Sequence, residues 1–244
     1  MSSAESRVCI IVPAYNEEVN IRPVIEDLRR CHPEFKIVVI NDCSEDGTEK
    51  AVRELGQTVL NLPVNLGIGG AVQTGLKFAR DNGYDIAVQF DGDGQHRAIE
   101  IERIITPVIN GEADVVIGSR FLSPGNYKGS FSRRLGISVF RFVNSLMVGS
   151  RILDNTSGFR AYNRDAISFL ARIYPQDYPE PEAVIELHRN RFSIMEVPVV
   201  MRERTGGKSS IGVFGSIYYM IKVLLGIMIA FSRKPIPREE PEDG

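Results

Sequence analysis

Short apolar runs alternate with helical segments through the first half of the chain, and this alternation limits the fold more than any other feature. The runs at 8–12, 36–41, 58–62, 85–90 and 114–118 are rich in β-branched residues and have the length of buried strands. A helical segment follows each of the first four runs. Strands that alternate with helices predict an α/β fold with a doubly wound, mostly parallel sheet flanked by helices.

Polar side chains follow four segments of this pattern at the point where each strand ends. They are Asn16-Glu17, Asn41-Asp42, Asn65, and the pair Asp91 and Asp93. Ligands of doubly wound sheets bind beyond the carboxyl ends of the strands, so these side chains predict a site at that edge. Polar residues after only one strand would be weaker evidence for a site, because Asn, Asp and Gly also favour ordinary turns.

Asp91 and Asp93 come directly after the fourth strand, with Gly92 between them. Side chains two positions apart at a strand end point to the same side, and glycine lets the backbone turn tightly beside them. Paired carboxylates suit Mg²⁺ or Mn²⁺, which would stabilise a departing diphosphate. Gln95 and His96 are available as a third ligand or as groups that support the ligands. The alternative is a polar turn that happens to contain two aspartates.

The glycine-rich segment 65–71 matches neither common phosphate-binding loop. It lacks the second spacing of Gly-x-Gly-x-x-Gly, it follows the third strand and not the first, and it lacks the Gly-Lys-Ser/Thr of a P-loop. We interpret it as a helix N-terminus that allows the backbone to approach a ligand or the metal loop, the segment that carries Asp91 and Asp93. A helix start packed against the sheet is the alternative.

The regular alternation ends after residue 118. A helix is expected over 130–149, where cations accompany an apolar face, and a polar turn over 154–160 precedes a helix over 164–172. Three prolines between 174 and 181 predict a loop, with Pro181 as the first residue of a helix that continues to 190.

A last strand is expected over 194–201, and it leads into the cationic segment 202–210. Arginine, lysine and glycine together in that segment suit a clamp that closes on phosphate groups. A mobile solvated loop is the alternative.

The segment 213–231 is apolar over nineteen residues, with Lys222 as its one charge. This length is near the minimum for a membrane span, but a central lysine opposes insertion. We favour a helix that lies on the membrane surface or against a membrane-protein subunit. Pairing with a second copy, burial in the protein's own core and a true span are the alternatives. The tail 235–244 is rich in Pro and Glu and is expected to be disordered.

The overall composition excludes some classes of function. A net charge of −2 argues against general nucleic-acid binding, which requires a strongly basic face. Apolar residues make up 43% of the chain, enough for a full core. Residues 1–7 are polar and unlike a secretory leader, so a cytoplasmic location is expected.

Three motifs resemble those of family 2 glycosyltransferases with the GT-A fold. They are Ile-Val-Pro-Ala-Tyr-Asn-Glu-Glu at 11–18, Asn-Asp-Cys-Ser-Glu-Asp-Gly-Thr at 41–48 and Phe-Asp-Gly-Asp-Gly-Gln-His at 90–96. Further segments at 118–120, 156–160 and 196–199 are most similar to dolichyl- or polyprenyl-phosphate mannose or glucose synthases. The resemblance implies a catalytic domain over 1–210, followed by the apolar helix at 211–234 and the tail.

For the donor, the resemblance implies a nucleotide-sugar site in two parts. The nucleoside pocket would be lined by Pro13, Tyr15, Glu17 and Asp42. Asp91 and Asp93 would hold Mg²⁺ or Mn²⁺ on the diphosphate, with Gln95 as a further ligand. A loop with Arg202, Arg204, Lys208 and Ser209 would close over the phosphates. The lysine of this loop is displaced from its usual place, because the chain has Arg204-Thr-Gly-Gly-Lys208-Ser209 where the branch has Arg-x-x-Gly-x-Ser-Lys.

For the acceptor, the resemblance implies that Arg120 and one of Arg133 or Arg134 hold a lipid phosphate. Glu182 lies where the branch has an acidic residue on the helix before the last strand, and it is a further catalytic candidate. The proline-rich entry to this helix departs from the usual pattern of the branch.

The resemblance implies an inverting transfer of a hexose from a UDP- or GDP-hexose to a polyprenyl phosphate. The enzyme would work at the cytoplasmic membrane face, as a peripheral or anchored protein. A phosphate acceptor is already anionic and needs little or no general base. A saccharide hydroxyl, as in cell-surface polysaccharide synthesis, is the alternative acceptor; it requires a base, for which Glu182 or Asp154 are candidates. A non-catalytic sugar-nucleotide-binding scaffold subunit is a further alternative.

Overall fold

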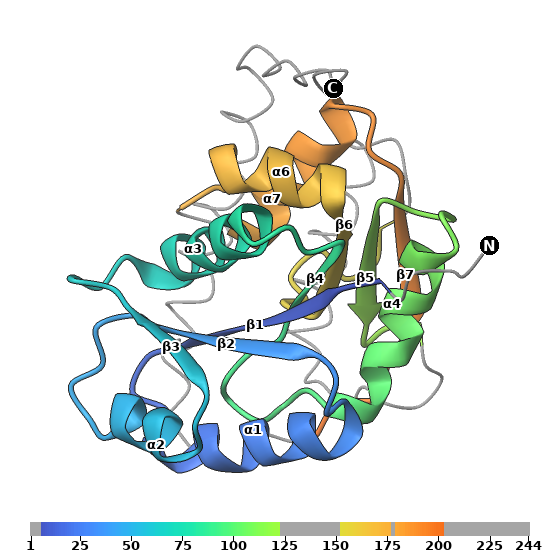
Figure 1. Cartoon of the computed structure of the whole chain (residues 1–244). Helices are drawn as coiled ribbons and strands as arrows, with labels where there is room; N and C mark the ends of the chain where they lie inside the picture. The colour runs from blue at the N-terminus through green and yellow to red at the C-terminus, as the bar shows by residue number, and fades with distance from the viewer. Residues whose placement is uncertain (1–5, 123–151, 177–178, 203–244) are drawn as a thin grey trace, which may run out of the picture.

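The computed structural model describes residues 6–122, 152–176 and 179–202 of the chain (Figure 1). The strands are β1 (Val8–Ala14), β2 (Lys36–Asn41), β3 (Thr58–Asn61), β4 (Ile86–Gln89), β5 (Val115–Ser119), β6 (Arg160–Asn163) and β7 (Ile194–Pro198). The helices are α1 (Glu18–Cys31), α2 (Thr48–Glu54), α3 (Gly67–Asp81), α4 (Ile101–Ile109), α6 (Arg164–Ile173) and α7 (Pro179–Arg189), with a 3₁₀ turn at Ala98–Glu100 before α4.

The strands form one seven-stranded sheet in the order β3-β2-β1-β4-β6-β5-β7. β1 pairs in parallel with both β2 and β4, and β2 pairs in parallel with β3, so these four strands end at the same edge. β6 runs antiparallel between β4 and β5, and β7 pairs in parallel with β5. The predicted mostly parallel sheet is confirmed, although the sequence pattern did not reveal β6.

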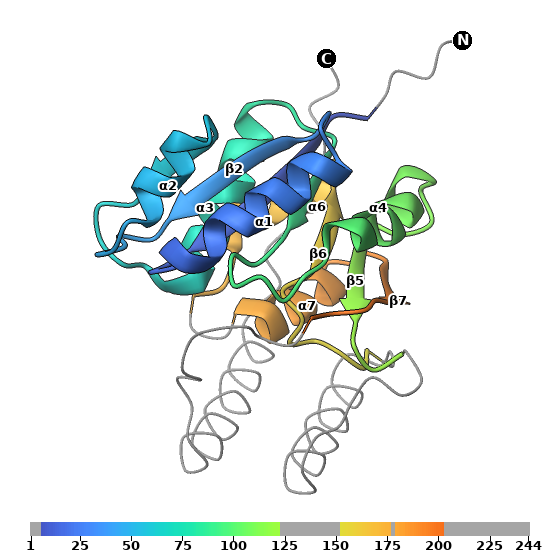
Figure 2. The same ribbon diagram turned by 90° about the horizontal axis from the view of Figure 1, so that it is seen from below.

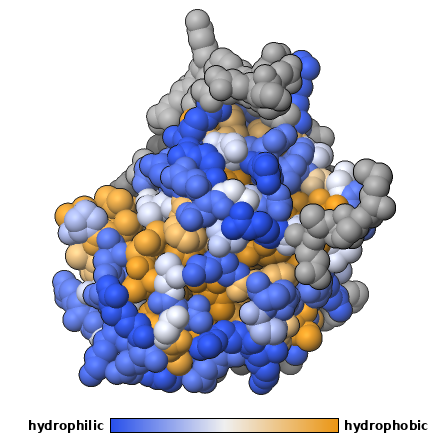
Figure 3. Space-filling model, viewed as in Figure 1, coloured by the Kyte–Doolittle hydropathy of each residue, from blue (hydrophilic) through white to orange (hydrophobic). Residues whose placement is uncertain are grey.

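Helices cover both faces of the sheet, as a doubly wound fold requires. α1 and α4 lie on one face and α3 and α6 on the other (Figures 1 and 2). Each face has its own core, with Ile25 and Ile104 in one and Leu76 and Leu170 in the other, all fully buried. Apolar side chains also reach the surface across the middle of the face shown in Figure 3, between hydrophilic areas.

α3 approaches β1 closely because Gly75 has no side chain. A Cβ atom at Gly75 would lie 2.1 Å from Cγ2 of Ile11, which is much closer than two carbon atoms can pack. The contact fixes α3 against β1, which contains Pro13 near its end and is followed directly by Tyr15. The first turn of α3 is thereby held at the edge where the parallel strands end.

One local prediction is wrong. α7 begins at Pro179 and not at Pro181, so the predicted loop ends earlier than expected. Both prolines fit the first turn of a helix, where backbone N–H groups have no partner within the helix. α1 begins at Glu18, while Asn16 has φ 55° and its side chain accepts a hydrogen bond from Glu45 N at 2.8 Å.

Among the described helices, none has both the length and the apolar composition to cross a bilayer. The apolar segment 213–231 and the tail lie outside the described residues, as does the predicted helix over 130–149. The expectations for these segments stay predictions.

Candidate active site

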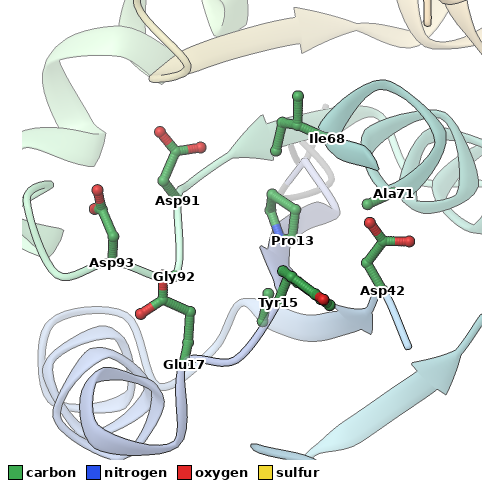
Figure 4. A pocket seen from close by; sticks show the side chains of 10 residues that line it. Pro13, Tyr15, Glu17, Asp42, Ile68, Ala71, Asp91, Gly92 and Asp93 are labelled. Atoms are coloured by element: carbon green, nitrogen blue, oxygen red, sulfur yellow. The ribbon is translucent and has the colours of Figure 1, made fainter. Parts of the chain in front are cut away.

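A cavity of 210 Å³ opens where β1, β2 and β4 end, next to the first turn of α3 (Figure 4). It lies at the edge that the polar strand exits predicted. The cavity is lined by Pro13, Ala14, Tyr15, Glu17, Asp42, Ile68, Ala71, Asp91, Gly92 and Asp93. The structure therefore brings together six residues that the sequence singled out for the donor site, from three separate strand ends.

Asp91 stands two residues beyond the last residue of β4, and its carboxylate is held from two sides. Oδ2 is 3.0 Å from Nε2 of His96, and a Cβ atom at Gly158 would lie 2.6 Å from the same oxygen. Burial raises the pKa of Asp91, but His96, Arg120 and Arg160 outweigh it, and the pKa lies below its ordinary value. Because its pKa is lowered, Asp91 is ionised at neutral pH. Its side chain is 32% exposed, toward the cavity that it lines.

Asp93 shapes the turn that follows. Its Oδ1 accepts a hydrogen bond from Gln95 N at 3.0 Å, and the residue lines the cavity beside Asp91. Gln95 is not among the residues that line the cavity. Within the described parts of the chain, no group of three or more His, Cys, Asp or Glu side chains is arranged to hold a metal ion. Asp91 and Asp93 are the two carboxylates that the end of β4 brings to the cavity, beside those of Glu17 and Asp42.

The nucleoside side of the cavity is built by the ends of β1 and β2. Tyr15 is 47% exposed at the rim, whereas Asp42 is only 3% exposed. Oδ1 of Asp42 accepts a hydrogen bond from Leu66 N at 2.7 Å, so Asp42 also fixes the residue before α3. Asn41, the polar residue before Asp42, does not line the cavity. Its Nδ2 donates to Asn61 Oδ1 and its Oδ1 accepts from Ser44 N, so it supports the ends of β2 and β3.

The glycine-rich start of α3 fulfils parts of both interpretations that the sequence left open. Ile68 and Ala71 line the cavity, so the first turn does face the site. Gly69 is packed against the chain, since a Cβ atom there would lie 2.4 Å from the carbonyl oxygen of Pro175.

Arg120 follows β5 and is fixed by Asp154. Nε and Nη2 of Arg120 donate to the two carboxylate oxygens of Asp154 at 2.8 and 2.6 Å, and Nη2 also donates to Thr156 Oγ1 at 2.9 Å. Asp154 is fully buried, and its backbone N–H donates to Glu196. An aspartate that is buried and bonded in this way is not placed to take a proton from a substrate, which weighs against it as a base.

Arg160 is a site residue to which sequence reasoning assigned no role. It is fully buried, and its guanidinium donates to the backbone carbonyls of Asn155, Ser157 and Glu180 at 2.7 to 3.0 Å. These bonds tie the 155–158 turn to the first turn of α7. The signal was present in the segment Thr-Ser-Gly-Phe-Arg at 156–160, but the partners of Arg160 are carbonyl groups, which no side-chain pattern reveals.

Two acidic residues of the first turn of α7 lie near this region, Glu180 and the predicted Glu182. Burial and the charge of Asp91 raise the pKa of Glu180 above its ordinary value, although Arg160 acts in the opposite direction. Glu182 is half-buried on the same helix. The sequence indicated the helix but did not single out Glu180.

The remaining predicted contacts lie beyond the described residues. They are Arg133, Arg134, Arg204, Lys208 and Ser209. Arg202, the last described residue, lies beside the turn after Asp93: its backbone N donates to Gln95 O at 2.8 Å, and its Nη2 donates to Asp27 Oδ2 at 3.0 Å. Arg202 therefore lies next to Gln95, two residues after Asp93.

Comparison with known proteins identifies the family. The family model described as Glycosyl transferase family 2 matches residues 9–170, more than half of the chain. The chain belongs to glycosyl transferase family 2. This glycosyltransferase is 33% identical, over 80% of its own length and 86% of the relative, to a UDP-N-acetylglucosamine–dolichyl-phosphate N-acetylglucosaminyltransferase of Methanococcus voltae. It is 32% identical to an undecaprenyl-phosphate mannosyltransferase of Micrococcus luteus, over 83% of its own length and 86% of the relative.

Solved structures show the same fold in another enzyme. The crystal structure of glucosyl-3-phosphoglycerate synthase from Mycobacterium tuberculosis, in complex with Mn²⁺, UDP and glucosyl-3-phosphoglycerate, superposes with a TM-score of 0.71. The match covers 93% of this chain and 80% of that one at 20% identity. The predicted GT-A architecture is confirmed by this likeness.

Proposed function

We propose that this glycosyltransferase transfers a hexose from a nucleotide diphosphate sugar to a polyprenyl phosphate, with inversion at the sugar carbon. The observation that carries the proposal is the cavity that joins Tyr15 and Asp42 to the two carboxylates of Asp91 and Asp93. The relatives from Methanococcus voltae and Micrococcus luteus, both named for lipid-phosphate acceptors, support the choice of acceptor.

The donor set fits a hard divalent cation. Asp91 is ionised and Asp93 presents a second carboxylate on the same wall, and both offer the oxygen ligands that Mg²⁺ and Mn²⁺ prefer. Asp91 and Asp93 would hold the ion, and Gln95 is a candidate third ligand. When bound, the cation supplies positive charge that stabilises the departing diphosphate. The Mn²⁺ complex of the Mycobacterium tuberculosis neighbour supports a divalent metal in this fold.

The chain positions the donor through the nucleoside pocket. Tyr15 offers an exposed aromatic ring at the rim, and Asp42 offers a carboxylate deep in the cavity that can accept from a base N–H. Pro13 and Glu17 complete this wall. These contacts suit the nucleoside of either a UDP- or a GDP-hexose. Arg204, Lys208 and Ser209 are proposed to close over the phosphates from the segment that begins beside Gln95.

The acceptor phosphate is proposed to bind at Arg120. Asp154 holds the Arg120 guanidinium in one orientation, so little conformational freedom is lost when an anion binds. An oxygen of the lipid phosphate attacks the anomeric carbon, the bond from that carbon to the diphosphate breaks, and the nucleoside diphosphate leaves. No proton has to move, because the attacking oxygen is already anionic. Arg133 or Arg134 is proposed as a second contact to this phosphate.

A membrane-bound acceptor requires the enzyme to work at a membrane surface. We propose that the protein is peripheral on, or anchored to, the cytoplasmic face, through the apolar segment 213–231 or a membrane-protein subunit that this segment contacts. Pairing of two copies through the same segment is an alternative use of it.

The proposed function predicts metal-dependent formation of a glycolipid. Purified protein and membranes would be incubated with UDP- and GDP-hexoses, Mg²⁺ or Mn²⁺, and a short polyprenyl phosphate. We expect one donor to give a glycosyl-lipid, and EDTA to abolish its formation, because Asp91 and Asp93 act through the cation. Donor hydrolysis without lipid product would contradict the lipid acceptor. Donor binding without turnover in any mixture would favour the scaffold alternative.

A saccharide hydroxyl as acceptor would need a base, and α7 carries the candidates. The raised pKa of Glu180 suits proton transfer, and Glu182 is two positions further along the same helix. With a lipid phosphate we expect Glu182→Gln and Glu180→Gln each to retain transfer to within about tenfold, because no proton moves. Loss of about 100-fold or more, with donor binding intact, would favour the hydroxyl acceptor. The measurement is kcat with the active donor, alongside titration of that donor.

A further inference from the structure

We propose that His96 is a positioning residue that holds the carboxylate of Asp91 in the orientation that binds the metal. The inference rests on the proposed function only in taking Asp91 as a metal ligand. The sequence left His96 open as a ligand or as a support, and the contacts of its ring distinguish the two roles.

The His96 ring is fixed by two aromatic neighbours. It stacks on Phe159 with ring centroids 4.9 Å apart and an angle of 21° between the planes. It meets Phe90 edge-on, with centroids 5.3 Å apart and an angle of 70°. The side chain is only 4% exposed, so it cannot swing into solvent without giving up both contacts. The direction of its nitrogen atoms is therefore set by packing.

Only one of the two ring nitrogens acts on a neighbour in the described chain. Nε2 lies 3.0 Å from Asp91 Oδ2, while Nδ1 is buried and has no hydrogen-bond partner among the described residues. A carboxylate that ligates a metal only accepts hydrogen bonds, so the proposed role makes Nε2 the donor of this pair. His96 is not among the residues that line the cavity, and its Nε2 is already engaged. This arrangement fits a support and not a metal ligand.

Asp91 is confined on its other side by a glycine. Gly158 approaches so closely that a Cβ atom there would lie 2.8 Å from Oδ1 and 2.6 Å from Oδ2 of Asp91. Gly158 precedes Phe159, the residue on which His96 stacks. The turn at 155–158 is itself fixed by the buried guanidinium of Arg160. His96 therefore joins the metal loop to this turn and leaves the Asp91 carboxylate few orientations.

A ligand that is already oriented binds a cation more tightly, because less conformational freedom is lost on binding. Hydrogen-bond partners of ligating carboxylates typically contribute about 10- to 100-fold to metal affinity. Asp93 has a different support, the backbone N–H of Gln95. His96 should thus affect the metal through Asp91 alone.

The test compares variants of His96 with a matched histidine. His96→Phe keeps an aromatic ring between Phe90 and Phe159 but removes the donor. His96→Gln and His96→Asn both introduce an amide, but only the longer glutamine can place its nitrogen near the position of Nε2. Comparing the two tests whether a donor at that position is required. His32 is also 4% exposed and stacks on Phe35 at 4.9 Å, but its Nε2 bonds Ala98 O, so His32→Phe is the control.

Mn²⁺ affinity is measured by calorimetry and by electron paramagnetic resonance, with UDP and with GDP present, and thermal unfolding is recorded for each variant. We expect His96→Phe and His96→Asn to bind Mn²⁺ about 10- to 100-fold more weakly than the wild type. His96→Gln should recover most of the affinity, and His32→Phe should match the wild type.

Equal Mn²⁺ affinity in His96→Phe and the wild type would overturn the proposal, as would equal losses in His96→Gln and His96→Asn. The result does not depend on turnover. If the wild type makes no glycolipid but the variants still differ in Mn²⁺ affinity as expected, the lipid-phosphate function fails and the role of His96 stands. If glycolipid forms and the affinities are equal, the reverse holds.

Discussion

Asparagine in place of Asp93 is expected to lower glycosyl transfer by about 100- to 1000-fold, the loss typical when one group that stabilises transition-state charge is removed. The side-chain oxygen of asparagine can still accept the hydrogen bond that Gln95 N gives to Asp93 at 3.0 Å, so the turn is kept. What is lost is a carboxylate on the cavity wall that is proposed to hold the cation. Initial rates of glycolipid formation over a range of Mn²⁺ concentrations measure the effect.

Asp46 provides a matched control for this substitution. Its Oδ1 accepts from the backbone N of Thr48, again two residues ahead and at 3.0 Å, but Asp46 is not among the residues that line the cavity. Asp46→Asn gives up the bond that Glu18 N donates to Oδ2, but its oxygen can still accept from Thr48 N and no charge of the cavity lining is lost, so transfer should stay within about tenfold. Equal losses in both variants would mean that turn geometry, and not the charge on the metal, accounts for the effect of Asp93→Asn.

The first half of the fold could be predicted because four of its strands, β1, β2, β4 and β5, are buried on both faces. Such strands are continuous apolar runs, and the predicted strand at 36–41 coincides with β2. Polar residues directly after these runs then mark the strand ends. Glu17, Asp42 and Asp91 reach one cavity for this reason, since parallel strands bring their carboxyl ends to a single edge.

The second half was harder to predict because its elements depend on contacts distant in sequence. β6 is four residues, Arg-Ala-Tyr-Asn, with polar ends and no run of β-branched residues. It is a strand because β4 and β5 pair with it on both sides. Such pairing partners are not encoded in a local pattern. The start of α7 was predicted wrongly for a different reason. A proline is common both in loops and in the first turn of a helix, so Pro179 did not reveal which of the two it belongs to.

The roles of the buried polar residues Asp154 and Arg160 could not be predicted from the sequence either. Asp154 drew attention as a carboxylate that could act as a base, whereas in the fold it is enclosed between Arg120 and the backbone. Arg160 has carbonyl partners from two separate segments. The residue type indicates the chemistry that a side chain can perform, but burial and partners decide whether it faces the substrate or supports a neighbour.

Alanine in place of Asp154 is expected to destabilise the fold by about 3 kcal/mol and to raise the KM for the lipid phosphate. The substitution leaves the Arg120 guanidinium without its bidentate partner, and the backbone N–H of Arg120 loses an acceptor at 2.9 Å. Asp154 is fully buried while the Arg120 side chain is 35% exposed, so the cost is at the lower end for a broken buried pair. Denaturant unfolding and steady-state kinetics measure the two effects.

The pair of Asp85 and Arg164 is a control of the same chemistry at the surface. Their side chains are 36% and 66% exposed, and Asp85→Ala is expected to cost about 1 kcal/mol or less for this pair. Asp85 also accepts from Arg7 N, a bond that adds to the cost but lies away from the cavity. A loss of stability in Asp154→Ala no larger than in Asp85→Ala would contradict the view that Asp154 is a buried support.

Asp154→Asn separates support from catalysis, because it keeps the shape of the side chain and removes only its charge. If Asp154 acted as a base, this variant would lose kcat while the KM for the acceptor stayed unchanged. If Asp154 orients Arg120, the asparagine oxygen can still accept one of the guanidinium bonds, so a partial rise in the KM for lipid phosphate is expected. Arg120→Lys should then raise the same KM, and adding Asp154→Asn to it should raise the KM by less than the product of the two single effects, since both substitutions break the same pair.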